Sequence, residues 1–178
     1  MKATEMLKRQ HRDVKKLFGR AKKASPKERE DILEKIESSL RTHMHIEETI
    51  FYPAVLEHSK AKKTQDMIGE AYEEHDVVKL VLNTFATLDP EDERFEAKMT
   101  VLDELIQHHV DEEEKEMFPA AEKLGGEELN ALAEEMESAA DDAEGAPGDE
   151  NEDEEEDDED EDERSSRKQD DVRIGHRH

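Results

Sequence analysis

Six ionisable side chains recur along the first two thirds of the chain as two copies of one pattern. In each copy a single histidine is followed by an HxxxE pair, and a proline, Pro53 or Pro119, lies ten positions after that pair's histidine. The six residues are His11, His43 and Glu47 in the first copy, and His75, His109 and Glu113 in the second. Imidazole nitrogen and carboxylate oxygen are donors that iron, manganese, zinc and nickel accept. The pattern therefore predicts a metal site.

These six residues fall on apolar stripes with helical spacing. The stripes of the first and third segments are Leu7, His11, Val14, Phe18 and Ala21, and Ile68, Ala71, His75, Val78, Leu82 and Phe85. The second stripe is Ile36, Leu40, His43, Glu47, Ile50 and Ala54. The fourth is Phe95, Met99, Leu102, Ile106, His109, Glu113 and Ala120, the last reached by way of Met117 or Glu116. The six candidates thus occupy positions that face a core.

Helix boundaries are marked by capping residues and glycines. Ser25-Pro26 precedes a glutamate three residues after the serine, Asp89-Pro90 repeats the arrangement, and Gly125-Gly126 ends a segment. We expect helices at residues 2–24, 27–58, 63–87 and 91–123, and a short one at 127–139. Short connections between long helices predict an all-α, up-down-up-down antiparallel four-helix bundle. Residue counts from each turn place the four histidines within about two helical turns of one level.

The two prolines fall inside predicted helices, where each removes a backbone hydrogen bond and bends the helix. The bend is either a tolerated kink or a feature that shapes the entrance of the site. Glu48 and Glu114 match each other in the two copies, and we expect them near the metals. Tyr72 is either a hydrogen-bond donor to a bound ligand or a packing residue. Three histidines off the stripes are expected at the surface: His45, His58 and His108.

Four imidazoles and two carboxylates are a generous set for one ion and about right for two. Within HxxxE the two side chains share one helix face, so they can bind the same metal or adjacent metals. One buried histidine taken alone is more often a hydrogen-bonded core residue than a ligand. Burying two carboxylates without a cation is costly, however, and the pattern occurs twice. The combination therefore favours a metal.

Composition divides the chain into a domain at residues 1–140 and an acidic tail at 141–178. The tail holds 19 of the 52 acidic residues and 5 of the 26 basic ones, and positions 149–163 are acidic except for Asn151. Such a block cannot bury enough apolar surface to fold, so we expect a disordered tail. It either keeps the protein soluble, or it serves a function. That function would be to dock on a protein partner, which is unknown, or to gather cations.

Several classes of protein are disfavoured by composition. Because the chain has no cysteine, a metal site must use nitrogen and oxygen donors. The sequence shows neither a signal peptide nor an apolar run long enough to cross a membrane, which predicts a cytoplasmic protein without membrane contact. An acidic chain without a basic stripe is also a poor candidate for nucleic-acid binding.

The motifs at residues 1–124 resemble those of the hemerythrin-like (HHE) cation-binding family. The resemblance rests on the two HxxxE pairs with their following Phe51-Tyr52-Pro53 and Phe118-Pro119, and on His11 and His75. It implies a four-helix bundle that houses a non-haem di-iron centre, with the six residues as ligands.

Oxygen-carrying hemerythrins supply a second histidine from the third helix and end with HxxxxD. Here Ala71 and Lys79 stand four positions either side of His75, and the last motif is HxxxE. This departure points toward the broader family, whose members are linked to iron or oxygen sensing and to nitric oxide or peroxide responses.

Three functions are compatible with these residues. The first is a non-catalytic di-iron protein that binds or senses oxygen, nitric oxide or iron. The second is a di-iron oxidase or peroxidase in stress defence, although such oxidases usually carry more carboxylates and Glu-x-x-His pairs. The third is a mononuclear or structural metal that stabilises the bundle. The histidine-rich set favours binding over catalysis.

Overall fold

The computed structural model describes residues 1–145, and within this range every regular element is helical. The long helices are α1 (Ala3–Ala21), α2 (Pro26–Ile46), α4 (Lys62–Asn83), α5 (Glu93–Glu112) and α7 (Gly126–Gly145). The short elements are η1 (Glu47–Phe51), α3 (Tyr52–His58), η2 (Thr84–Thr87), η3 (Glu113–Met117), α6 (Phe118–Ala121) and η4 (Glu122–Leu124). The predicted all-helical class is confirmed. The tail predicted to be disordered lies, from residue 146 onward, outside the described residues.

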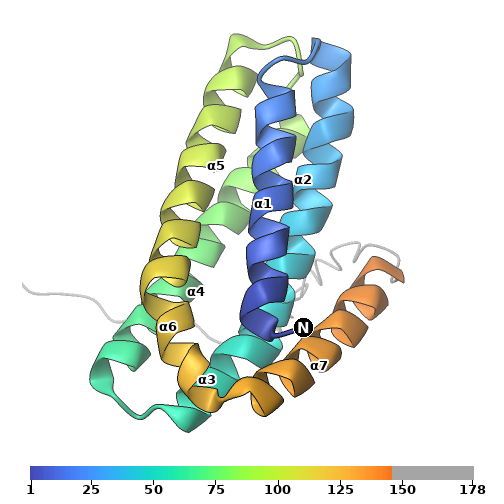
Figure 1. The fold of residues 1–178 in the computed structure, drawn as a ribbon. Coiled ribbons are helices and arrows are strands. Elements are labelled where there is room, and N and C mark those ends of the chain that lie inside the picture. The colour runs from blue at the N-terminus through green and yellow to red at the C-terminus, as the bar shows by residue number, and fades with distance from the viewer. Residues whose placement is uncertain (146–178) are drawn as a thin grey trace, which may run out of the picture. The chain divides into compact units, whose positions relative to one another are not determined.

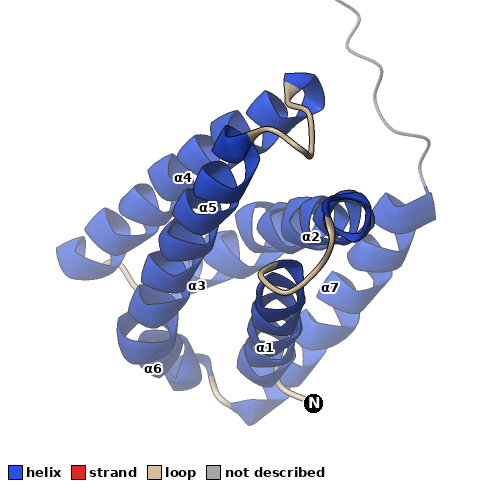
Figure 2. Cartoon of the chain, turned by 90° about the horizontal axis from the view of Figure 1, so that it is seen from above, coloured by secondary structure: helices blue, strands red, loops and turns tan. Residues whose placement is uncertain are grey.

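The helices that carry the six candidates run alternately up and down (Figure 1). Helix α1 packs beside α2 and α4 beside α5, while α2 and α5 continue through η1 and η3 into α3 and α6. Seen from above, α7 covers α1 and α2 on the side away from α4 and α5 (Figure 2). No helix among residues 1–145 is both long and apolar enough to cross a membrane.

Local capping explains where the helices begin. The Ser25 N–H donates to Glu28 Oε2 over 2.9 Å, and Pro26 occupies the first position of α2, as predicted. The prediction for α5 was wrong by two residues. Its cap is Asp92, whose side chain accepts a hydrogen bond from the Arg94 N–H, so the helix begins at Glu93 instead of residue 91. Gly125 has φ +96°, a conformation that favours glycine, and separates η4 from α7.

Each helix that carries an HxxxE pair continues into a π-helical turn that ends two residues before the proline. In η1 the Tyr52 N–H bonds to the Glu47 carbonyl, and in η3 the Phe118 N–H bonds to the Glu113 carbonyl. These bonds span five residues because a regular helix would bring the proline ring against the carbonyl four residues earlier. The predicted bend is therefore a widened turn, and it begins at the glutamate of each pair.

The widened turns correct the predicted apolar stripes. One extra residue per turn moves the following inward-facing positions along the chain by one. Ile50, Ala54 and Ala120, which we expected in the core, are only partly buried. The buried residues are instead Phe51, Tyr52, Val55, Phe118 and Ala121, together with Met117, one of the two residues considered between Glu113 and Ala120. The turn thus brings Tyr52, a residue not predicted to face the core, into the interior.

Helix α7 is longer than the short helix expected at residues 127–139 and runs beyond residue 140, where we had placed the domain boundary. Its apolar side is buried through Leu129, Leu132, Ala133 and Met136. These residues belong to a cluster that includes Leu7, Ile46 and Phe51 of the bundle. A second cluster, which includes Val14, Leu40 and Val78, lies on the other side of the histidines. The two clusters enclose the polar centre.

Candidate metal centre

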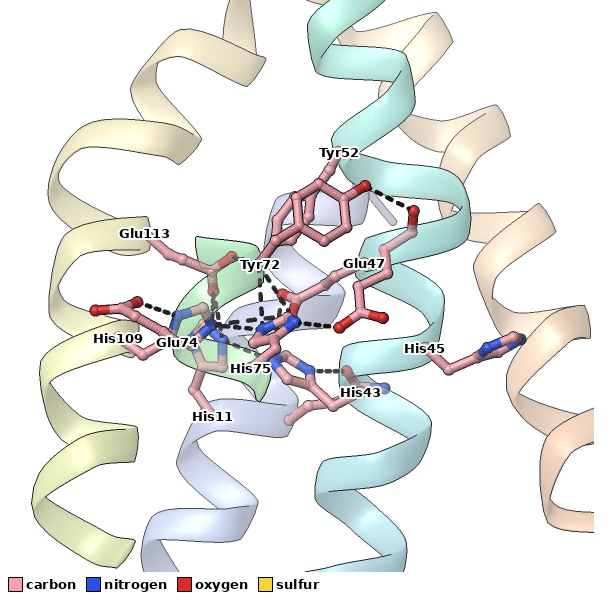
Figure 3. A network of polar contacts seen from close by, with 12 residues as sticks. His11, His43, His45, Glu47, Tyr52, Tyr72, Glu74, His75, His109 and Glu113 are labelled. Atoms are coloured by element: carbon pink, nitrogen blue, oxygen red, sulfur yellow. Dashed lines mark hydrogen bonds and ion pairs between the residues drawn. The ribbon is translucent and has the colours of Figure 1, made fainter. Parts of the chain in front are cut away.

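The structure brings all six predicted residues together in the middle of the bundle (Figure 3). His11 comes from α1, His43 from α2, His75 from α4 and His109 from α5, while Glu47 and Glu113 begin the two π-helical turns. Their exposed fractions lie between 0% and 6%. A cluster of this charge and burial requires compensation, because an unpaired buried carboxylate is strongly disfavoured.

The histidines form two pairs whose Nε2 atoms face each other. His11 Nε2 lies 3.2 Å from His43 Nε2, and His75 Nε2 lies 3.1 Å from His109 Nε2. The His11 and His43 pair groups with both glutamates, and the other pair groups with Glu47, with all donor atoms of a group within 4.8 Å of one another. Each group offers at least three donors at a spacing that one metal ion can bridge.

The two carboxylates lie between the histidine pairs. Glu47 Oε1 is 3.2 Å from His43 Nε2, while Glu47 Oε2 is 3.4 Å from His75 Nε2. Glu113 Oε2 is 3.2 Å from His11 Nε2 and 3.6 Å from His109 Nε2. Glu47 therefore turns one oxygen toward each pair, which is the arrangement of a carboxylate that bridges two ions.

Two carboxylate oxygens of the centre, Glu47 Oε1 and Glu113 Oε2, are buried without a hydrogen-bond partner. Burial and the charge of Glu113 raise the pKa of Glu47 well above its usual value. Burial also acts to raise the pKa of Glu113, but His109 and His11 outweigh it, and the pKa is lowered. The protein alone thus favours only one ionised carboxylate of the two. A bound cation would satisfy both free oxygens, so the residues fit a metal.

Each histidine is oriented by a partner of its Nδ1 atom. The contacts are His11 to Glu114 (2.9 Å), His75 to Glu48 (2.8 Å), His43 to Gln10 (2.7 Å) and His109 to Glu74 (2.8 Å). Since every partner atom is an acceptor oxygen, Nδ1 carries the proton and the Nε2 lone pair points inward. Metal-ligating histidines are commonly held in this way.

The sequence predicted only two of these four partners. Glu48 and Glu114 were expected near the metals, whereas Gln10 and Glu74 were missed. Each missed residue directly precedes the single histidine of its copy, which is the signal that could have identified it. The two copies therefore share the outer contacts as well as the six central residues.

The pKa values of the histidines favour neutral imidazoles in one part of the centre. Burial, followed by the charge of His11, lowers the pKa of His43 well below its usual value. Burial also lowers the pKa of His75, to about 4. For His109 burial is outweighed by Glu113 and Glu74, and the pKa is raised. Neutral His43 and His75 at pH 7 are ready to bind a metal, because the imidazole must lose a proton to become a ligand.

Tyr52 places a hydroxyl group inside the centre, a role that we had considered for Tyr72. The Tyr52 hydroxyl donates to Glu113 Oε1 over 2.9 Å and lies 3.4 Å from both Glu47 Oε2 and His75 Nε2. Burial and the charges of the two glutamates raise its pKa, so it remains protonated. The Tyr72 hydroxyl instead donates to the Glu48 carbonyl over 3.0 Å. The sequence signal that could have identified Tyr52 is the corresponding residue of the second copy, Phe118. An aromatic residue at the same position in both copies indicates a position that faces the core.

Lys79 pairs with the outer part of the centre. Its ammonium group lies 2.8 Å and 3.1 Å from the two oxygens of Glu48, the carboxylate that holds His75. Lys79 thus supports the orientation of His75 from outside. Among the histidines predicted at the surface, His45, His58 and His108 are all exposed, as expected.

Replacing Glu48 with alanine is expected to weaken metal binding by about 10–100-fold, because His75 loses the acceptor that fixes its ring. Competition against a chromophoric chelator would measure the change. The matched control is Glu57→Ala, which removes an exposed carboxylate just beyond η1. Equal affinities for wild type and Glu48→Ala would show that the contact between Glu48 and His75 does not stabilise the centre.

The family comparison agrees with this geometry. The model of the family described as hemerythrin HHE cation binding domain matches residues 2–121, about two thirds of the chain. The chain belongs to this family. A solved structure of a hemerythrin HHE cation binding domain-containing protein from Mycobacterium kansasii is also similar, with 26% sequence identity and a TM-score of 0.71. That match covers 82% of this chain and 88% of the other. A comparison with curated proteins finds no match.

The match to this cation-binding family confirms the resemblance predicted from the sequence. It ends at residue 121, before α7 begins at Gly126. Helix α7, which packs through its buried apolar side, is therefore a helix of this protein that the family model does not include.

Proposed function

We propose that this hemerythrin HHE protein holds two iron ions and binds or senses a small molecule, oxygen or nitric oxide, or iron itself. The proposed ligands are His11, His43, Glu47, His75, His109 and Glu113. The observation that carries the proposal is the position of Glu47, whose two oxygens face different histidine pairs. Four imidazoles and two carboxylates suit iron, which supplies the open coordination positions where a diatomic molecule can attach.

The space beside the histidines supports a small ligand. A cavity of about 10 Å³ is lined by all four histidines and by Gln10, Val14, Leu40, Met44, Ile106 and Val110. This volume accommodates about one water-sized molecule. The lining side chains are mostly apolar, so they favour an uncharged molecule and keep larger reactants away from the centre.

Replacing Tyr52 with phenylalanine tests the contribution of its hydroxyl group. We expect the metal content to stay the same and the bound ligand to dissociate about fivefold faster, since a lost hydrogen bond costs about 1 kcal/mol. Stopped-flow measurement of nitric oxide dissociation would give the rate. Tyr72→Phe, which removes a hydroxyl bonded to a backbone carbonyl, is the matched control. Equal rates in wild type and Tyr52→Phe would contradict this role.

The alternative function is a di-iron oxidase or peroxidase in stress defence. The position of Tyr52 favours it, because its hydroxyl lies inside the centre, 2.9 Å from Glu113 Oε1, where it can donate a hydrogen bond to a peroxide that enters. The two functions differ in turnover. Repeated consumption of hydrogen peroxide by the iron-loaded protein would support the enzyme, whereas binding of one diatomic ligand per centre without turnover would support the binding protein.

A further inference from the structure

We propose that Glu74, His108 and Glu112 form a second divalent-cation site, on the surface of the bundle. His108 Nε2 lies 3.4 Å from Glu74 Oε1 and 3.4 Å from Glu112 Oε1, and the three donor atoms lie within 4.8 Å of one another. Both distances exceed the roughly 2.7–3.2 Å of an ordinary N–H···O hydrogen bond. Donors bound at about 2.1 Å around a tetrahedral ion are separated by about 3.4 Å, so the spacing suits a shared cation.

The three side chains are held in place by the fold. His108 and Glu112 are four residues apart on α5, the same spacing as the buried HxxxE pairs, and therefore share one helix face. Glu74 reaches them from α4 and is fixed through its second oxygen, which accepts a hydrogen bond from His109 Nδ1 over 2.8 Å. Little ordering is needed to bring the donors together.

The other copy of the pattern lacks this set. The positions that correspond to Glu74, His108 and Glu112 are occupied by Gln10, Thr42 and Ile46. Gln10 orients its histidine as Glu74 does, so an acidic residue is not needed for that task. Ile46 is fully buried, and α7 packs against α2. The buried centre therefore does not explain why a histidine and two carboxylates meet on the α4 and α5 side.

The surroundings of the three residues favour a cation that arrives from solvent. The side chains of His108 and Glu112 are 63% and 41% exposed. A neighbouring cavity of about 280 Å³ is lined by Glu70, Glu73, Glu74 and His108, together with apolar residues. Its carboxylates attract positive charge, and one imidazole with two carboxylates suits zinc, manganese or ferrous iron.

The shared residue Glu74 connects the surface site to the buried centre. A cation on Glu74 Oε1 withdraws negative charge from the carboxylate that holds His109. Occupation of the surface site therefore weakens the support of one predicted ligand of the buried centre. The surface site itself does not depend on which metal the buried centre contains.

Zinc titration of the full-length protein tests the proposal. Calorimetry would follow Zn²⁺ binding after the metal already held by the buried centre has been measured. We expect His108→Asn and Glu112→Gln to weaken one equivalent of zinc binding at least tenfold. The metal content of the buried centre and the circular dichroism spectrum should stay unchanged. Acidic residues of the C-terminal segment contribute the same background in every variant.

The control variant is His45→Asn. His45 is also exposed, and among residues 1–145 it belongs to no cluster of side chains that could hold a metal ion. It should bind zinc as wild type does. An unchanged isotherm in His108→Asn, or an equal loss in His45→Asn, would overturn the proposal. A fall of the buried metal content in His108→Asn would also overturn it, because His108 would then belong to the buried centre.

Discussion

Replacing Glu47 with alanine should reduce the metal content from about two ions per chain to one or none. Glu47 is the residue whose oxygens face both histidine pairs, so its loss removes a donor from each group at once. The remaining histidines and Glu113 can still hold one ion with lower affinity. Elemental analysis of protein reconstituted with ferrous iron without oxygen would give the count.

In protein stripped of metal, a substitution that removes the carboxyl group of Glu47 is expected to raise the stability of the fold. Glu47 Oε1 is buried without a hydrogen-bond partner, and burial together with the charge of Glu113 raises the pKa of Glu47, so at neutral pH the stripped protein must take up a proton to keep this carboxyl group buried. Removing it relieves an unfavourable burial, whereas in the loaded protein it removes a ligand. Glu47→Gln, which keeps the shape of the side chain, should therefore raise the apo melting temperature while it lowers the metal content.

Glu57→Ala is the control for these measurements, because Glu57 is exposed on α3 and should change neither quantity. Retention of two irons by Glu47→Ala would contradict a bridging role. A wild-type protein with one metal that also persists in Glu47→Ala would support the mononuclear, structural site bound by histidines alone.

Replacing Leu129 or Met136 of α7 with alanine should lower the free energy of unfolding by about 2–5 kcal/mol each. Both side chains are fully buried and belong to the cluster that contains Ile46 and Phe51. Helix α7 also contacts η1, which begins with Glu47, so the variants should bind metal more weakly as well. Urea denaturation of the loaded and stripped proteins would measure both effects.

The control on the same helix is Glu134→Ala, whose side chain is exposed. Its free energy of unfolding should stay within about 0.5 kcal/mol of the wild-type value. Wild-type stability of both Leu129→Ala and Met136→Ala would show that α7 is not part of the folded core.

The candidate centre was predictable because its residues interrupt regular apolar stripes. Histidine and glutamate at core positions, repeated in two copies, identified all six residues that the structure brings together. The outer residues were harder to predict, since Gln10 and Glu74 act across to a neighbouring helix. Such contacts depend on how two helices are rotated against each other, which spacing along one helix does not determine.

The π-helical turns explain why the stripes after Glu47 and Glu113 were predicted wrongly. A period of 3.6 residues was continued through Pro53, whereas the chain inserts a wider turn at Glu47–Phe51, two residues before that proline. This local change decides that Tyr52 faces the metal centre and Ile50 does not face the core. A proline after an HxxxE pair was the available signal, but it was interpreted only as a bend.

The length of α7 was underestimated for a different reason. The acidic composition of residues 141–178 placed the domain boundary at residue 140, and the helix was expected to end at residue 139. Leu129, Leu132, Ala133 and Met136 nevertheless recur three and four residues apart, which is sufficient to bury one face of a helix against α1 and α2. Acidic residues on the opposite face do not prevent this packing.

The central claim, a dinuclear iron centre bridged by carboxylates, is tested most directly by iron analysis combined with Mössbauer spectroscopy. The measurement uses the full-length protein, purified without oxygen and examined before and after exposure to air. We predict about two irons per chain, magnetically coupled in the oxidised protein because Glu47 and Glu113 lie between the histidine pairs. One iron per chain, two uncoupled irons, or a single zinc ion would contradict the account.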